Sequence, residues 1–222
     1  MTEPLSVELF AGIGGMALAS HWAGFRHVAL VENDEFCQSV LRRNFGSDVE
    51  IHGDVTTFDG TRYAGTGIAL VSGGFPCQDI SLSGEGAGLV EGERSKLWFE
   101  MLRIIGEIRP CFVLAENVAA LRTRGADIVL DGLEEIGYNC TAVVVGSENV
   151  GAPHRRKRAF IVAERRDVGH ACGSRLPRIP RRGTGPLAPD GHPRDEARSL
   201  ADAVEVGLEG GQGEQELSLI HI

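Results

Sequence analysis

The sequence predicts an α/β fold built on a doubly wound, mostly parallel, Rossmann-like sheet. Over residues 1–166, short apolar runs alternate with longer segments in which apolar residues recur at helical spacing, which is typical of strands joined by crossover helices. A glycine-rich turn follows the first apolar run at Phe10–Gly15. From Asp167 onward the periodicity is lost and Gly, Pro and Arg dominate, so we predict one domain over 1–166 and a largely disordered linker, or the start of a truncated variable region, over 167–222.

The predicted strands are short and apolar, and several are rich in β-branched residues. They cover Ser6–Phe10, His27–Val31, a short run ending before Gly53, Ile68–Ser72, Phe112–Ala115, Cys140–Val145 and Ala159–Ala163.

The predicted helices lie between these strands. One begins at Gly15, and the next has Asn33 or Asp34 as its N-cap. A third carries an apolar stripe and ends before Pro110, where a helix cannot continue. The helical ranges are Gly15–Ala23, the segment that ends at Phe45, Lys96–Ile108 and Ile128–Ile136.

Composition limits the classes of function. The formal net charge is −9, which argues against a nucleic-acid-binding protein as a whole, but a local basic patch at Arg155–Arg158 can still meet a phosphate backbone. No apolar run is long enough to span a membrane and no signal peptide precedes the first strand, so we expect a cytoplasmic protein that does not bind membranes. The five cysteines form no Cys-x-x-Cys pair, and we expect no metal.

The glycine turn indicates a nucleotide site. Gly12, Gly14 and Gly15 let the backbone approach a ligand, although a plain tight turn explains the glycines equally well. Glu32 ends the second strand, where a carboxylate can accept hydrogen bonds from both ribose hydroxyls, and Asp54 can accept one from an adenine amino group. The spacing of the glycines does not fit Gly-x-Gly-x-x-Gly, which disfavours an NAD-dependent oxidoreductase.

Two reactive side chains follow strands in the middle of the predicted sheet. Cys77 lies in a loop, which suits a nucleophile, and Pro76 fixes the backbone ahead of it. Glu116 directly follows the Phe112–Ala115 strand, so its carboxyl is expected at the same edge of the sheet, where it could act as a general acid. Taken singly, a packing cysteine and a helix-capping glutamate are the more common interpretations.

Together, these segments resemble the DNA cytosine-C5 methyltransferases over Val7 to about Ala163. Phe10-Ala-Gly-Ile-Gly-Gly15 is similar to the family's cofactor motif, Gly74-Phe-Pro-Cys-Gln78 to its catalytic motif, Glu116-Asn-Val118 to its cytosine-holding motif, and His154-Arg-Arg-Lys-Arg158 to its arginine motif. The resemblance implies an S-adenosylmethionine-dependent methyltransferase fold, S-adenosyl-L-methionine as cofactor and double-stranded DNA as substrate.

The resemblance also implies a role for each matching residue. Cys77 would attack C6 of a flipped-out cytosine while Glu116 contacts N3; Arg158 would contact O2, and Arg156 would orient Glu116 or the catalytic loop. The family usually has Gln at the position of His154, which leaves the contact made there open. The other expected substrate-binding residues are Gln78, Ser81 and Asn117, and the cofactor-binding set is Phe10, Ala11, Gly12, Gly14, Gly15, Glu32, Asn33, Asp54, Val55 and Pro76. The glycine-rich run Ser83–Gly92 would be a lid or an ordinary loop.

The family's target-recognition region and its last two motifs have no counterpart after Ala163. We therefore expect either a fragment or a chain that a separate polypeptide completes by supplying target recognition, with apolar surface left uncovered on the first helix. Two alternatives stay open on these residues, a tRNA cytosine-C5 methyltransferase and a non-catalytic subunit that binds cofactor or DNA.

Overall fold

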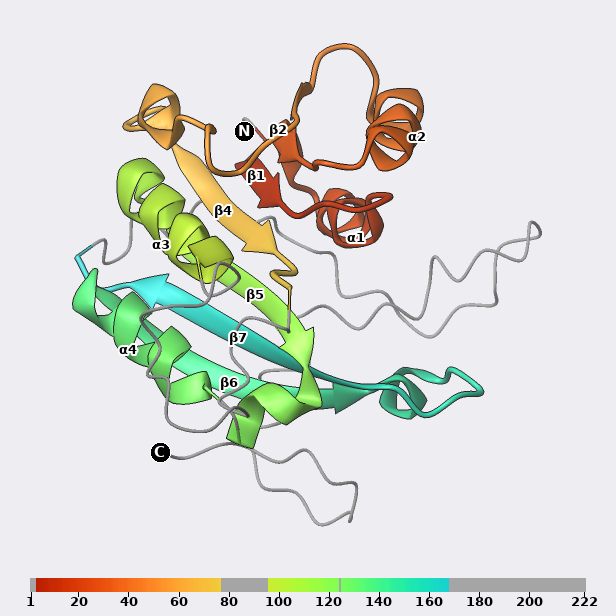
Figure 1. The fold of residues 1–222 in the computed structure, drawn as a ribbon, viewed down its shortest axis with the longest axis vertical. Helices are drawn as coiled ribbons and strands as arrows, with labels where there is room; N and C mark the ends of the chain where they lie inside the picture. The colour runs from red at the N-terminus through yellow and green to blue at the C-terminus, as the bar shows by residue number, and fades with distance from the viewer. Residues whose placement is uncertain (1–2, 77–95, 124, 168–222) are drawn as a thin grey trace.

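The computed structural model describes residues 3–76, 96–123 and 125–167, and these contain a seven-stranded mixed sheet (Figure 1). The strand order is β3-β2-β1-β4-β5-β7-β6. The strands β3, β2, β1, β4 and β5 pair in parallel, whereas β7 is antiparallel to both of its neighbours. The bounds are β1 Leu5–Leu9, β2 Arg26–Val31, β3 Glu50–His52, β4 Ile68–Gly73, β5 Phe112–Val118, β6 Tyr138–Gly146 and β7 Lys157–Arg165.

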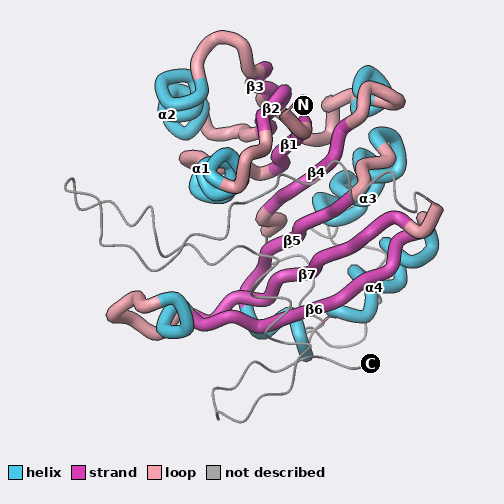
Figure 2. The backbone as a smooth tube through the Cα atoms, turned by 180° about the vertical axis from the view of Figure 1, so that it is seen from behind, coloured by secondary structure: helices cyan, strands magenta, loops and turns pink. Residues whose placement is uncertain are grey.

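Helices cover both faces of the sheet, which confirms the doubly wound α/β prediction. The helices α1 and α2 lie on one face, and α3 and α4 lie on the other (Figures 1 and 2). Among the described residues, the short 3₁₀ turns η1, η3 and η4 lie in the connections. The bounds are α1 Gly15–Trp22, α2 Glu35–Phe45, α3 Lys96–Ile108, α4 Ala126–Glu135, η1 Gly60–Tyr63, η3 Ala119–Thr123 and η4 Ser147–Val150.

The strands contribute side chains to the cores on both faces of the sheet, because successive side chains of a strand point to opposite faces. Leu9 is fully buried in the larger core with Met101 of α3, whereas Leu30 is buried with Ala17 of α1 and Leu41 of α2. Strands buried on both sides read as near-continuous apolar runs, as do Val28–Val31 of β2 and Ile68–Val71 of β4, whereas β1 also contains Ser6 and Glu8. Asp34, one of the two expected caps, begins α2 by accepting a hydrogen bond from the backbone N–H of Cys37 at 2.8 Å.

The strand β5 is longer than the sequence predicts. The parallel neighbour β4 ends opposite Ala115, but the antiparallel neighbour β7 continues to pair through Val118, which lies opposite Arg158. Glu116 and Asn117 are therefore strand residues rather than the first residues of a loop. The carboxyl end of β5 extends beyond that of β4 as a result.

The outer face of α1 carries apolar side chains. Leu18 and Trp22 lie one helical turn apart and are 41% and 56% exposed. This agrees with the expectation of uncovered apolar surface on the first helix. No helix within residues 3–76, 96–123 and 125–167 combines the length and the apolar character needed to cross a bilayer.

One ionisable side chain is buried inside the sheet. Glu8 of β1 is 1% exposed, and its carboxyl accepts a hydrogen bond from the Ser72 hydroxyl of β4 at 3.2 Å. Burial disfavours the charged form and raises the pKa of Glu8 from 4.5 to about 8. The neutral acid is therefore the form that the folded protein accommodates near pH 7.

We expect replacement of Glu8 by the neutral isostere, Glu8→Gln, to remove a pH dependence of stability. Because the pKa of Glu8 is 4.5 in the reference state and about 8 when folded, the folded state holds the proton more tightly, and this stabilisation is complete below pH 4.5 and is lost as the pH rises to about 8. Urea unfolding at several pH values should show the wild type losing more stability than Glu8→Gln across that window. Parallel curves for the two proteins would contradict the assignment.

Candidate active site

Glu32, Asp54 and the glycine loop lie at one edge of the sheet, where the parallel strands have their carboxyl ends. In register, Leu9 of β1 lies between Val31 and Gly73, Val31 lies beside His52, and Gly73 lies beside Ala115. The loops that follow β1, β2, β3 and β4 therefore emerge side by side next to the end of β5 (Figure 1). Ligands of open α/β sheets bind at this edge.

The glycine loop after β1 has an unusual backbone. Phe10, Gly12 and Gly14 all have positive φ angles, of 55°, 56° and 92°. A Cβ on Gly14 would lie 2.8 Å from the ring of Phe45 and 2.9 Å from Leu41, so only glycine lets α2 pack this closely. A Cβ on Gly12 or Gly15 would meet nothing within 4 Å, so those two positions border open space.

Glu32 joins the glycine loop to the start of α2. One carboxylate oxygen accepts a hydrogen bond from the backbone N–H of Gly12 at 2.7 Å, and the other accepts one from the N–H of Asp34 at 2.9 Å. Each carboxylate oxygen can accept more than one hydrogen bond, so ligand hydroxyls can still bind. Ala11 is buried and donates to the Val31 carbonyl at 3.0 Å, whereas Asn33 is exposed.

Asp54 follows β3 and lies on the same side of the sheet edge as Glu32. Its Oδ1 atom accepts hydrogen bonds from the backbone N–H and the hydroxyl of Thr56, both at 2.8 Å. The side-chain hydrogen bond from Thr56 is the main reason that the pKa of Asp54 is lowered, so this exposed carboxylate stays ionised at neutral pH. Val55, next in the chain, is 7% exposed.

Glu116 forms an ion pair with Arg158. The guanidinium Nε atom lies 2.7 Å from a Glu116 carboxylate oxygen, and each side chain is 25% exposed. A Cβ built on Gly74 would lie 3.1 Å from the other oxygen of Glu116. The carboxylate therefore lies between β7 and the chain segment that follows β4.

The ion-pair partner of Glu116 is Arg158. The resemblance implied that Arg156 would orient Glu116 or the catalytic loop, and of these two arginines the structure places Arg158 beside Glu116. In the antiparallel register Glu116 lies opposite Phe160 and Val118 lies opposite Arg158, which makes Arg158 a diagonal neighbour of Glu116 on the same face of the sheet. Arg156 precedes the strand, is exposed, and pairs through its backbone with Ser147.

Asn117 has a buried side chain that contacts protein. It is 3% exposed; its amide Nδ2 donates to the Phe75 carbonyl at 3.0 Å, and its Oδ1 accepts from the Val118 N–H at 2.8 Å. Phe75 is 3% exposed and packs against Trp98 of α3, with ring centroids 5.1 Å apart. Asn117 thus anchors the segment that leads to Pro76.

Several predicted residues lie outside the described residues. These are Cys77, Gln78, Ser81 and the glycine-rich run Ser83–Gly92. Pro76, exposed, is described, and so is His154, whose backbone carbonyl accepts a hydrogen bond from the Ser147 hydroxyl. His154, Arg155, Arg156 and Lys157 are exposed where the β6–β7 hairpin extends past the sheet (Figure 1).

Three residues near the site were missed by the sequence reasoning. Thr56 orients Asp54. Phe75 anchors the loop after β4 through its bond to Asn117, and Arg103 binds the loop after β3. The Asp-x-Thr spacing at Asp54 is a recognisable local hydrogen-bonding turn. No sequence pattern relates Arg103 to a loop 45 residues earlier, since that contact depends on how α3 packs.

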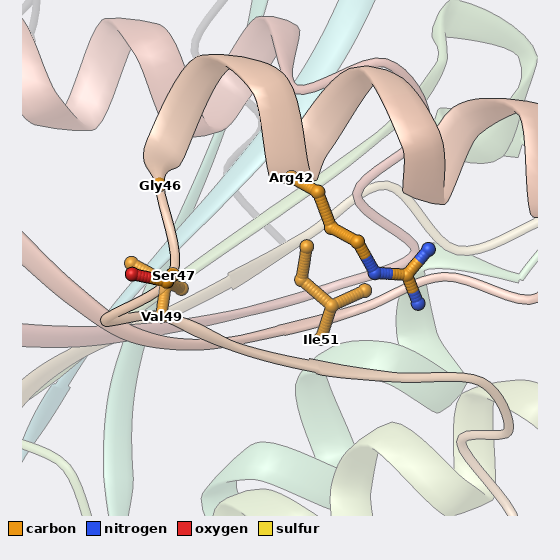
Figure 3. A pocket seen from close by; sticks show the side chains of 5 residues that line it. All are labelled: Arg42, Gly46, Ser47, Val49 and Ile51. Carbon is orange, nitrogen blue, oxygen red and sulfur yellow. The ribbon is translucent and has the colours of Figure 1, made fainter.

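Other features of the described chain are separate from this edge. Residues 3–76, 96–123 and 125–167 contain no group of three or more His, Cys, Asp or Glu side chains arranged to hold a metal ion. A cavity of about 290 Å³ lies where α2 ends and the chain leads into β3, which is the opposite end of that strand from Asp54 (Figure 3). It is lined by Arg42, Gly46, Ser47, Val49 and Ile51.

Comparison with known proteins identifies close sequence relatives. The family model described as C-5 cytosine-specific DNA methylase matches residues 5–184. The type II methyltransferases M.PspPI of Psychrobacter sp. (strain TA137) and M.Eco47II of Escherichia coli are 39% and 38% identical over 167 residues, which is 73% of this chain. The chain spans only 40% of the length of each.

The fold is shared with a solved structure, the S. pombe Dnmt2 methyltransferase. That crystal structure superposes with a TM-score of 0.61 at 22% identity, covering 72% of this chain and 50% of the other. At this level of identity the likeness supports the Rossmann-like α/β architecture and nothing further.

Asn117→Ser should destabilise the protein by about 1–3 kcal/mol, because the shorter side chain leaves the buried Phe75 carbonyl without its donor. Chemical denaturation measures the free energy of unfolding directly. Asn139→Ser is the matched control: Asn139 is exposed and accepts one hydrogen bond from Arg166, so we expect a change within about 0.5 kcal/mol. Equal effects at the two positions would argue against the anchoring role of Asn117.

Proposed function

Since the chain belongs to the C-5 cytosine-specific DNA methylase family, we propose that it transfers a methyl group from S-adenosyl-L-methionine to C5 of a flipped-out cytosine in double-stranded DNA. The activity is a proposal because the matched relatives are more than twice as long as the region they share with this chain. One observation carries it: the segment leading to Cys77 contacts the strand that bears Glu116, through Gly74 beside Glu116 and through the bond between Phe75 and Asn117.

The residues at the sheet edge fit the proposed cofactor. The loop Phe10–Gly15 borders open space at Gly12 and Gly15, where a backbone can approach a ligand closely. Glu32 would accept hydrogen bonds from the ribose hydroxyls, and ionised Asp54 would accept one from the adenine amino group. The bound cofactor would supply an electrophilic methyl group. Asn33, Val55 and Pro76 complete the proposed set with Phe10 and Ala11.

The proposed chemistry uses a covalent adduct, because C5 of cytosine is a weak nucleophile until a group adds to C6. The Cys77 thiolate forms a bond to C6, and electron density moves toward N3, where Glu116 hydrogen-bonds or protonates the ring. C5 then takes the methyl group. Loss of the C5 proton and elimination of the thiolate restore the aromatic ring and free Cys77.

Arg158 is proposed to orient Glu116 and also to contact the cytosine. Its guanidinium has five N–H donors, of which the Nε donor binds Glu116 and one at Nη1 binds the Lys157 carbonyl at 3.1 Å. The donors that remain can reach O2 of a flipped base. This assigns Arg158 both the expected contact with O2 and the orienting role expected of Arg156.

DNA binding is proposed to use the exposed basic end of the β6–β7 hairpin. Lys157 begins β7, and Arg155 and Arg156 directly precede this strand, which pairs with β5 and places Arg158 beside Glu116. A phosphate backbone could therefore be bound while a cytosine occupies the site. A separate polypeptide or further chain would supply recognition of the target sequence. Contacts near the base would come from Gln78, Ser81 and His154.

Covalent trapping tests the reaction. We expect a mixed-sequence DNA duplex containing 5-fluorocytosine to form a stable adduct with the protein when S-adenosylmethionine is present, because fluorine at C5 cannot leave as a proton does. Mass spectrometry of digested adduct should place the DNA on Cys77, and Cys77→Ala should form none.

Cys140→Ala is the matched control and should form the adduct as the wild type does. Burial raises the pKa of Cys140 to about 11, so this thiol should not react. Methyl transfer to tRNA but not to duplex DNA would replace the proposal with the tRNA enzyme. Cofactor binding without any adduct or transfer would indicate a non-catalytic subunit.

Glu32→Gln should weaken S-adenosylmethionine binding by roughly 10-fold, because a carboxylate binds hydroxyl donors more strongly than a neutral amide does. Isothermal titration calorimetry gives the dissociation constants. Glu35→Gln, an exposed substitution in the first turn of α2, should leave binding unchanged. Equal affinities for wild type and Glu32→Gln would remove Glu32 from the cofactor site.

A further inference from the structure

An arginine of α3, Arg103, binds the loop between β3 and η1. The Arg103 guanidinium donates to the Val55 carbonyl at 3.1 Å through Nη2 and to the Phe58 carbonyl at 3.2 Å through both Nη1 and Nη2. Within the turn, the Val55 carbonyl also accepts a hydrogen bond from the backbone N–H of Phe58 at 3.4 Å. Arg103 is a further donor to Val55, and it joins both carbonyls to α3 through one side chain.

Two carboxylates on α3 hold Arg103 in place. Its Nε donates to Glu100 and its Nη1 to Glu107, each at 2.7 Å. Glu107 also accepts a hydrogen bond from the backbone N–H of Gly60 at 2.9 Å. All three nitrogens of the guanidinium are thus engaged, and α3 contacts the loop at Val55, Phe58 and Gly60, three positions on the C-terminal side of Asp54.

The same loop begins beside Asp54, which belongs to the proposed cofactor-binding set. Asp54 is exposed and is oriented by Thr56, while Phe58 is 1% exposed and packs between His52 and Tyr63. Arg103 therefore binds the backbone of Val55, the residue that follows Asp54, and the Asp54 carboxylate is oriented by Thr56 of the same turn. Moving the Val55 carbonyl would move Asp54 with it.

We propose that Arg103 is a positioning residue for cofactor recognition, holding the Asp54–Phe58 turn so that Asp54 can read the adenine amino group; this rests on the proposed function. Arg103 acts through the loop and does not touch the ligand. Lysine cannot replace it, because a single ammonium group lacks the planar fork that binds two carbonyls and two carboxylates at once.

The test compares two ligands that differ at one group. S-adenosylhomocysteine carries the adenine amino donor, whereas S-inosylhomocysteine carries a carbonyl that would face the Asp54 carboxylate. In the full chain, calorimetry should show the wild type preferring the adenine form by roughly 10-fold or more, as expected for a hydrogen bond to a charged acceptor. Arg103→Lys should reduce this preference several-fold, and Asp54→Asn should abolish it.

Two further variants control for general effects on folding. Arg62→Met removes an exposed ion pair with Glu50 near the same loop and should leave the preference unchanged. Glu107→Gln weakens the bond to Arg103 and Gly60 and should reduce the preference in the same direction as Arg103→Lys, which keeps the test informative if Arg103→Lys folds poorly. A double variant, Arg103→Lys with Asp54→Asn, should show the same lack of preference between the two ligands as Asp54→Asn alone, because Arg103 acts through Asp54.

The outcomes separate the two proposals. If the wild type prefers the adenine form but Arg103→Lys and Glu107→Gln keep the full preference, the positioning role is overturned while the proposed function stands. A wild type that binds neither ligand would overturn the proposed function and, with it, this inference. A loss of affinity for both ligands by the same factor in Arg103→Lys would show a general structural role and would also overturn the inference.

Discussion

The antiparallel pairing of β7 with β5 is the constraint on which the candidate site depends. It extends β5 past the end of β4, so that Glu116 and Asn117 stand on a hydrogen-bonded strand instead of a loop, and it brings Arg158 from the far end of the domain to within 2.7 Å of Glu116. A loop would hold a charged pair less firmly, because ordering it costs conformational entropy. The strand supplies that order through its backbone bonds to β7.

The same edge combines groups of opposite sign within a chain of formal charge −9. The acids Glu32 and Asp54 follow the parallel strands, on the proposed cofactor side, and Arg155, Arg156 and Lys157 lie at the start of the antiparallel strand. Charges in solvent act over about one Debye length, roughly 8 Å at physiological salt. A locally basic hairpin can therefore attract phosphates even though the chain is acidic overall.

The sequence allowed the fold to be predicted well where the signal was local. The strands β2 and β4 contain runs of apolar residues, Asp34 is a typical N-cap, and the positions of the glycine loop, Glu32 and Asp54 followed from where strands end. The extent of β5 and the partner of Glu116 could not be predicted, because both depend on the register between strands about 45 residues apart in sequence. The burial of Asn117 was not predictable for the same reason: an exposed polar residue and a buried one that bonds to Phe75 look alike in sequence until the two segments are placed together.

The close packing at Gly14 limits how this site can be altered. A methyl group there would press on the ring of Phe45 and on Leu41, so a substitution at Gly14 would force the glycine loop and α2 apart. Gly15 has an ordinary helical backbone and empty surroundings. A side chain at Gly15 would therefore meet no protein atoms, and it would extend into space that is open to a ligand.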